Sequence, residues 1–280
     1  MIIPLSVAVL AAITLILQKF ILSYQKVNYK DFNIFVFAFL FLISAVFFPK
    51  FGWIKPDALS FYYISIAVLM IIFASLWNIL LSQALQKEKV IEFELIQMLQ
   101  PLATILLASL IFASERSVYI LPAAIIASLA LIVAHLKKNH LYFDKYSKYL
   151  LWAVLIMSVE TIFNKILLAV YSPVALYTLR TFWVTILMWL ILRPNFRTVN
   201  LKNGLTMIAT AGLAVFQMVL FYSAIQSEGL IFTTLILILS PILVYIFSIF
   251  VYKEKLIFRT ALAFTIIIFC IVFASLMEHR

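Results

Sequence analysis

Long apolar runs recur along nearly the whole chain, and they restrict the fold more than any other feature. We find ten, at residues 2–22, 32–49, 60–83, 90–112, 118–136, 149–170, 174–192, 204–225, 229–251 and 257–277. Most approach the roughly 20 residues that a helix needs to cross a hydrocarbon core about 30 Å thick. Because the runs are continuous, they predict helices, whereas a transmembrane β-barrel would show short alternating segments. We therefore expect an all-α integral membrane protein with ten transmembrane helices.

Composition indicates that little of the chain lies outside lipid. Of the 280 residues, 66% are hydrophobic and 11% are charged, against about half and a quarter in soluble domains. The longest connector, residues 135–149, is too short to fold alone. The first run lacks the basic region of a signal peptide and is interpreted as span one. We expect a multi-pass protein of the cell membrane, such as the bacterial inner membrane, present as a monomer or homodimer in the lipid bilayer.

The basic residues lie in short connectors, where they set membrane orientation. The net charge is +10, but single and paired charges between spans do not indicate a nucleic-acid partner. Connectors after the odd-numbered spans carry 13 Lys or Arg, at 26, 30, 87, 89, 137, 138, 145, 148, 193, 197, 202, 253 and 255. The other side carries four, at 50, 55, 116 and 280. The positive-inside rule then places the richer side in the cytoplasm and both termini outside.

The second half of the sequence repeats the first. When Pro101 is aligned with Pro241, eight of the 18 positions from Ala84 to Pro101 are identical to their counterparts. Five spans are thus duplicated, at 1–140 and 141–280, and since five is odd the copies enter the membrane in opposite senses. Many secondary transporters have this inverted architecture, with a central cavity between the repeats.

The two matched prolines lie near the middle of spans four and nine. Each frees a carbonyl one turn earlier and weakens its helix, which lipid tolerates only where protein or water satisfies the freed group. We interpret Pro101 and Pro241 as hinges beside the cavity, so that Pro101→Ala and Pro241→Ala would slow transport without preventing insertion. A plain structural kink is the alternative.

Three segments resemble a known family. They are "SQALQKEKVIEFELIQMLQPLATILLASLIFASER", "YSAIQSEGLIFTTLILILSPILVYIFSIFVYKEKL" and "FNKILLAVYSPVALYTLR". Together they are similar to EamA-type ten-span exporters of the drug/metabolite transporter (DMT) superfamily. The resemblance implies export of small metabolites, such as amino acids or related compounds, or of drugs, by alternating access. It also implies cytoplasmic termini, which conflicts with the loop charges.

Glu160 is the most informative polar residue. It lies 12 residues beyond Lys148 and so near the bilayer centre, where a charge costs at least about 2.5–3.5 kcal/mol. Asn164 shares its helix face, and Lys165 or Arg180 is close enough in sequence to pair with it. Glu160 is either a carboxyl that couples transport to protons or one member of a structural pair.

Further polar residues inside the spans are candidates for the cavity. Glu94, Gln97 and Pro101 share one helix face, whereas their span-nine counterparts are Thr234, Leu237 and Pro241, so an asymmetric cavity is expected. Arg180 would bind an anionic group or counter Glu160. Lys19 and Lys165, near span ends, are expected to extend to the interface. The remaining candidates are Gln100, Asn78 and Gln217.

Other classes of function fit less well. The sequence has no HExxH, Gly-x-Ser-x-Gly or nucleotide-binding motif, and Asp31, Asp57 and Asp144 are interpreted as single loop residues. The single cysteine, Cys270, forms no intrachain disulfide. We therefore expect no enzyme, no metal and no cofactor, with a small-molecule substrate and protons as a possible coupling ion. A channel or a non-transporting scaffold is the alternative.

Overall fold

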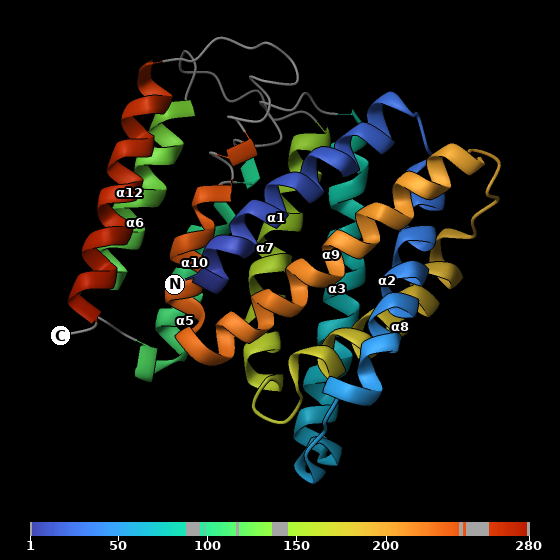
Figure 1. Cartoon of the computed structure of the whole chain (residues 1–280), viewed down its shortest axis with the longest axis horizontal. Helices are drawn as coiled ribbons and strands as arrows, with labels where there is room; N and C mark the ends of the chain where they lie inside the picture. The colour runs from blue at the N-terminus through green and yellow to red at the C-terminus, as the bar shows by residue number, and fades with distance from the viewer. Residues whose placement is uncertain are drawn as a thin grey trace.

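The computed structural model describes residues 2–87, 96–97, 99–115, 118–135, 145–240, 243–244 and 258–278, and these fold into a bundle of helices (Figure 1). The first half contributes α1 (Ile2–Lys19), a π-helical turn η1 (Phe20–Tyr24), α2 (Tyr29–Phe51), a 3₁₀ turn η2 (Pro56–Leu59), α3 (Phe61–Lys87), α5 (Leu99–Ile111), a 3₁₀ turn η3 (Ala113–Glu115) and α6 (Ile120–His135). The second half contributes α7 (Lys145–Leu167), α8 (Pro173–Leu192), α9 (Leu201–Glu228), α10 (Leu230–Leu237) and α12 (Phe258–Glu278).

Six helices in this described part of the chain are long and apolar enough to cross a membrane: α1 with η1, α2, α3, α7, α8 and α9. These correspond to predicted spans one, two, three, six, seven and eight. Predicted spans four, five, nine and ten overlap α5, α6, α10 and α12, and each of these four spans includes or adjoins residues outside the described ranges. The structure confirms an all-helical, multi-pass membrane protein, and the number ten stays a prediction.

Local sequence signals account for several helix starts. Asn28, Ser172 and Asn200 are N-cap residues of α2, α8 and α9, and the side chain of each accepts a hydrogen bond from a backbone N–H of the first turn. Pro173 follows Ser172 at the start of α8, where proline costs no hydrogen bond. Each connector therefore stops one helix and begins the next within a few residues.

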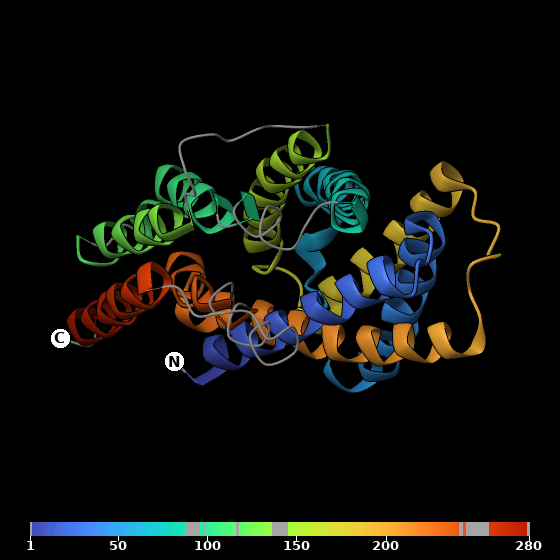
Figure 2. The same ribbon diagram turned by 90° about the horizontal axis from the view of Figure 1, so that it is seen from above.

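The helices pack in a regular set of pairs. α1 lies against α9 and α3 against α7, while α2 packs on α8, α5 on α10 and α6 on α12. In Figures 1 and 2 the red α12 and the green α6 run side by side at one end of the molecule. Every one of these pairs joins a helix of residues 1–140 to one of residues 141–280.

Connectors of the two halves also touch at both ends of the bundle. At one end, the turn after α2 meets the turn after α7 through a bridge between Ile54 and Tyr171, with Ser172 N donating to Trp53 O at 3.0 Å. At the other, Asn28 N donates to Thr198 Oγ1 at 3.1 Å, between the turns that precede α2 and α9. Hydrogen bonds between connectors therefore join the two halves at both ends of the bundle.

Of the two matched prolines, Pro101 lies within the described residues and Pro241 does not. Pro101 is buried in the third position of α5. Pro241 lies outside the described residues, but α10 ends at Leu237, four positions before it. A proline ring clashes with the carbonyl four residues earlier, so the end of α10 is where a proline at 241 would interrupt a helix.

Candidate functional site

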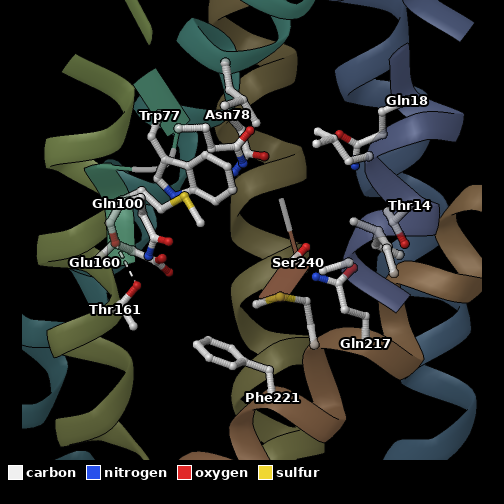
Figure 3. A pocket seen from close by; sticks show the side chains of 18 of the residues that line it. Thr14, Gln18, Trp77, Asn78, Gln100, Glu160, Thr161, Gln217, Phe221 and Ser240 are labelled. Atoms are coloured by element: carbon white, nitrogen blue, oxygen red, sulfur yellow. Dashed lines mark hydrogen bonds between the residues drawn. The ribbon is translucent and has the colours of Figure 1, made fainter. Parts of the chain in front are cut away.

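A cavity of about 230 Å³ lies inside the bundle. Its walls come from α1, α2, α3, α5, α7, α8, α9 and α10, and hence from both halves of the chain. Figure 3 shows Trp77, Gln100 and Glu160 on one side, facing Thr14, Gln18 and Gln217 on the other. Polar groups therefore converge on a space surrounded by apolar helices.

A buried ion pair forms part of this wall. Arg180 Nε on α8 donates to Glu160 Oε1 on α7 at 2.9 Å, and both side chains are 3% exposed. Asn164 Nδ2, one turn after Glu160, donates to the same oxygen at 2.8 Å. The Arg180 guanidinium also lies 5.9 Å from the centre of the Trp77 ring, close enough for a cation–π contact. Charged side chains are unfavourable within the membrane, and here the two charges neutralise one another at the cavity wall.

Several cavity-lining groups have no hydrogen-bond partner among the described residues. The donors are Trp77 Nε1 and Arg180 Nη2, and the acceptors are Gln97 Oε1 and Asn164 Oδ1. Within the same part of the chain, the Thr14 hydroxyl is also buried and unpaired. Most buried polar groups in proteins are satisfied, so these five unpaired atoms mark the polar part of the cavity wall.

Seven of the eight candidate substrate residues line the cavity: Asn78, Gln97, Gln100, Glu160, Asn164, Arg180 and Gln217. The hinge candidate Pro101 lines it as well, while Glu94 and Pro241 lie outside the described residues. Their binding of substrate stays a prediction. Gln97 and its counterpart Leu237 both face the cavity, one polar and the other apolar, as the expected asymmetry requires.

Sequence reasoning missed other lining residues, among them Thr14, Gln18, Asn33 and Tyr177. Gln18 and Asn33 are carboxamides inside predicted spans, the same signal that singled out Gln217. Tyr177 carries no such signal, because most tyrosines in membrane proteins serve packing or the interfacial belt. It is 1% exposed and packs edge-on against the Tyr222 ring, with centroids 6.1 Å apart.

At one end of the bundle, Glu115 joins the two halves. Its Oε2 accepts from the backbone N–H groups of Leu230 and Ile231, at 2.9 and 3.0 Å, and so caps the start of α10. Its Oε1 pairs with Lys165 Nζ at 2.6 Å. We call Glu115, Lys165 and the first residues of α10 the clasp. In the clasp, the glutamate comes from residues 1–140 and its partners from residues 141–280.

The structure corrects the expectation that Lys19 and Lys165 extend to the interface. Lys19 is 8% exposed and its Nζ donates to Leu85 O at 2.7 Å. Lys165 donates to Ile225 O at 3.4 Å besides pairing with Glu115. Each lysine therefore satisfies a carbonyl at the end of a neighbouring helix, where a cation is favoured.

The expectation that Asp31 is a plain loop residue is wrong, because its side chain is buried, at 2% exposed. Its Oδ1 accepts from the backbone N–H groups of Asn195 and Phe196, and its Oδ2 from the Thr198 hydroxyl. It anchors the connector between α8 and α9, a role that becomes visible only when distant segments meet.

Comparison with known proteins relates the second half of the chain to one family. Residues 146–276 match the model of the EamA-like transporter family. The match supports a membrane transporter of the DMT type, in agreement with the resemblance seen in the sequence.

A solved structure has the same fold over the whole chain. One crystal structure, described only as that of a protein, covers 100% of this chain with 97% of its own, at a TM-score of 0.71 and 16% identity. At that identity the likeness shows the fold alone. No curated protein matches the chain significantly.

Proposed function

We propose that this protein is a secondary transporter of the EamA type that exports small metabolites by alternating access between two inverted five-span halves. The observation that carries the proposal is the internal cavity, which is bordered by both halves and holds a buried ion pair. Secondary transporters built from inverted repeats bind substrate at such a position, near mid-membrane between the repeats.

Helix packing supports two related halves. In the repeat, α1 corresponds to α7 and α3 corresponds to α9. The contact of α3 with α7 therefore has a counterpart in the contact of α9 with α1, and both contacts are present. The pairs α2 with α8, α5 with α10 and α6 with α12 map onto themselves, and they are present too. Such a pattern is expected when a two-fold axis relates the halves.

Side-chain contacts repeat in the register that aligns Pro101 with Pro241. Lys19 donates to Leu85 O and Lys165 to Ile225 O, and these two carbonyls occupy matched positions of the repeat. Gln86 donates to Val27 O at 2.8 Å, and its counterpart Gln226 donates to Leu168 O at 2.8 Å. In each half the glutamine ties the end of the third span to the connector after the first.

The cavity lining repeats as well. Trp77 and Gln217 both line it and occupy matched positions in the same register, as do Gln100 and Ser240. In spans one and six, where Lys19 aligns with Lys165, Thr14 corresponds to Glu160 and Gln18 to Asn164. Matched positions of the two halves thus surround one space, but among the described residues only the second half supplies the ion pair.

The size of the cavity favours small metabolites over drugs. The cavity has a volume of about 230 Å³. Sites for drug-sized ligands are usually about 300–1,000 Å³. A compact metabolite fits better than a large hydrophobic drug.

Reconstitution into proteoliposomes tests the proposal. A carrier should show saturable uptake of labelled substrate that is accelerated by unlabelled substrate on the opposite side. Ionic current without such counterflow would instead indicate a channel, and the absence of both across a broad metabolite panel would indicate a scaffold. A catalytic product from any panel compound would argue for an enzyme.

A further inference from the structure

Two tyrosine rings lie between the cavity and the end of the bundle that carries the clasp. Tyr177 comes four residues after the start of α8, and Tyr222 comes six residues before the end of α9, or about 6 and 9 Å along the helices. Both helix ends adjoin the clasp, since α9 leads directly into α10 and α8 follows the end of α7. The rings are buried and pack edge-on, and Tyr177 lines the cavity. The pair therefore separates the cavity from this end of the molecule.

The repeat places a different pair at the opposite end. Asn33 is the fifth residue after the N-cap of α2, as Tyr177 is the fifth after the N-cap of α8. Ser82 of α3 aligns with Tyr222 of α9 in the register of the two matched prolines. Asn33 Nδ2 donates to Ser82 Oγ at 2.6 Å, and both side chains line the cavity. The same contact between neighbouring spans thus occurs twice, once polar and once aromatic.

The two pairs differ in how readily a solute could pass them. Tyr177 and Tyr222 are among the largest fully buried side chains in the described part of the chain. Close-packed aromatic rings leave no path for water until they separate. The side chains of Asn33 and Ser82 are much smaller, and water can replace the one hydrogen bond between them at little cost. The aromatic pair is therefore the stronger barrier.

We propose that Tyr177 and Tyr222 form the gate that closes the cavity toward the clasp, and that the cavity of this conformation exchanges with water at the opposite end, past Asn33 and Ser82. The inference rests on the proposed transport function and assigns one of the two gates that alternating access needs. Arg180 follows Tyr177 by three residues and so shares its helix face. A movement of α8 that parts the rings would therefore also act on the ion pair of Arg180.

Cysteine labelling tests which end of the cavity is closed. Cys270→Ser removes the one native thiol, and Met218→Cys then places a reporter on the cavity wall, one turn before Tyr222. A membrane-impermeant methanethiosulfonate reagent is applied to membrane vesicles of both orientations. A separate Asp57→Cys variant, in an exposed connector at the clasp end, reports which side of the vesicle that end faces.

With the gate intact, the reporter should react at least about tenfold faster from the opposite end, because the open form of a closed gate is populated at about 0.1–10%. The variant Tyr177→Asn/Tyr222→Ser copies the polar pair into the clasp end. Labelling from the clasp end should then rise to the rate seen from the other end. Equal rates from the two ends with the gate intact, or no rise in the variant, would overturn the proposal.

Two further variants show whether the bulk of the rings is responsible. Tyr177→Phe/Tyr222→Phe keeps both rings and should keep the slow rate from the clasp end. Tyr62→Ala is the matched control, because Tyr62 is an exposed tyrosine at the start of α3, at the same end of the bundle and outside the cavity. A rise in Tyr62→Ala as large as in the gate variant would show general loosening and contradict the gate. The comparison of the two ends with the gate intact holds even if a variant fails to fold.

Substrate counterflow in proteoliposomes separates the gate from the transport function. Unequal labelling without counterflow of any metabolite would reject transport and leave the gate in place. Counterflow with equal labelling from both ends would support transport and reject the gate.

Discussion

At the scale of single residues, Glu160 combines features that rarely coexist. It is buried, it accepts hydrogen bonds from Arg180 and Asn164, and it also borders the internal cavity. A structural pair would need only the first two features. If the cavity binds substrate as proposed, a proton on Glu160 and a bound substrate would influence one another there, as coupling requires.

We expect Glu160→Gln to abolish proton-driven accumulation while leaving substrate exchange intact, because glutamine accepts from Arg180 but carries no titratable proton. Accumulation in proteoliposomes with an imposed pH gradient, measured across pH, checks this. Asp57→Asn is the control, since Asp57 is an exposed acid in a connector. Wild-type accumulation and pH dependence in Glu160→Gln would show that Glu160 only holds α8 in place.

The Glu160→Gln variant also leaves Arg180 without its counter-charge. Removing one partner of a buried ion pair lowers the free energy of unfolding by about 3–5 kcal/mol. The double variant Glu160→Gln/Arg180→Gln removes both charges and tests for that effect. If it recovers the melting temperature but not accumulation, loss of coupling is separated from loss of stability.

Depth in an apolar run was enough to find Glu160, Asn164 and Arg180, because few polar residues lie so far into a predicted span. It was not enough to find the partners of Lys165 or Asp31. Those partners belong to segments up to 167 positions away, and which ones meet depends on how the helices are rotated and packed. Hydropathy reports that a residue is buried in the membrane, but not what it faces.

At the scale of elements, the clasp joins three helix ends with one carboxylate. Gly229 lies in this turn with φ +84°, a backbone conformation that residues with a side chain rarely adopt. The turn between α9 and α10 therefore depends on a residue without a side chain. This arrangement fixes the entry of α10 relative to α5 and α7.

We expect Glu115→Gln and Lys165→Met each to lower stability by about 1.5–3 kcal/mol, the worth of a hydrogen bond to a charged group. Because both variants break the same pair, the double variant should lose less than the sum of the two. Melting temperatures of the three variants in detergent form the double-mutant cycle. Additive losses would show that the two side chains do not act together.

The positions of the long helices were predictable from apolar runs, since α2, α3, α7, α8 and α9 each overlap one predicted span. The contacts between helix ends were not, because a pattern of hydropathy carries no information on which ends lie together. Only the internal repeat of the sequence indicated that contacts in one half would have counterparts in the other.

At the scale of the whole molecule, the contacts between connectors show which connectors lie at the same end of the helix bundle. The turns before α2 and α9 meet at one end, and those after α2 and α7 meet at the other. The first pair includes Lys26, Arg193 and Arg197, from the connectors rich in basic residues. The structure thus keeps these charges at one end of the bundle, as the positive-inside rule assumes.

We predict from these charges that the end with Lys26 and Arg193 faces the cytoplasm and that both chain termini lie outside. A green fluorescent protein fused after Arg280 should then remain dark, because it does not mature when exported unfolded. Fusions within the connector between α8 and α9 serve as the opposite control. A bright C-terminal fusion would favour the cytoplasmic termini that the family resemblance implies.

The neutral pairing of Glu160 with Arg180 also has an electrical consequence. A carrier whose cavity holds one negative and one positive charge moves no net charge when it reorients with an uncharged substrate. If Glu160 takes up a proton for the return step, that step carries one positive charge inward, worth about 2.3 kcal/mol for each 100 mV of membrane potential. Exchange of substrate for substrate should therefore ignore voltage, whereas proton-driven export should quicken when the interior is made negative with potassium and valinomycin. Equal voltage dependence of the two modes would mean that the proton travels elsewhere.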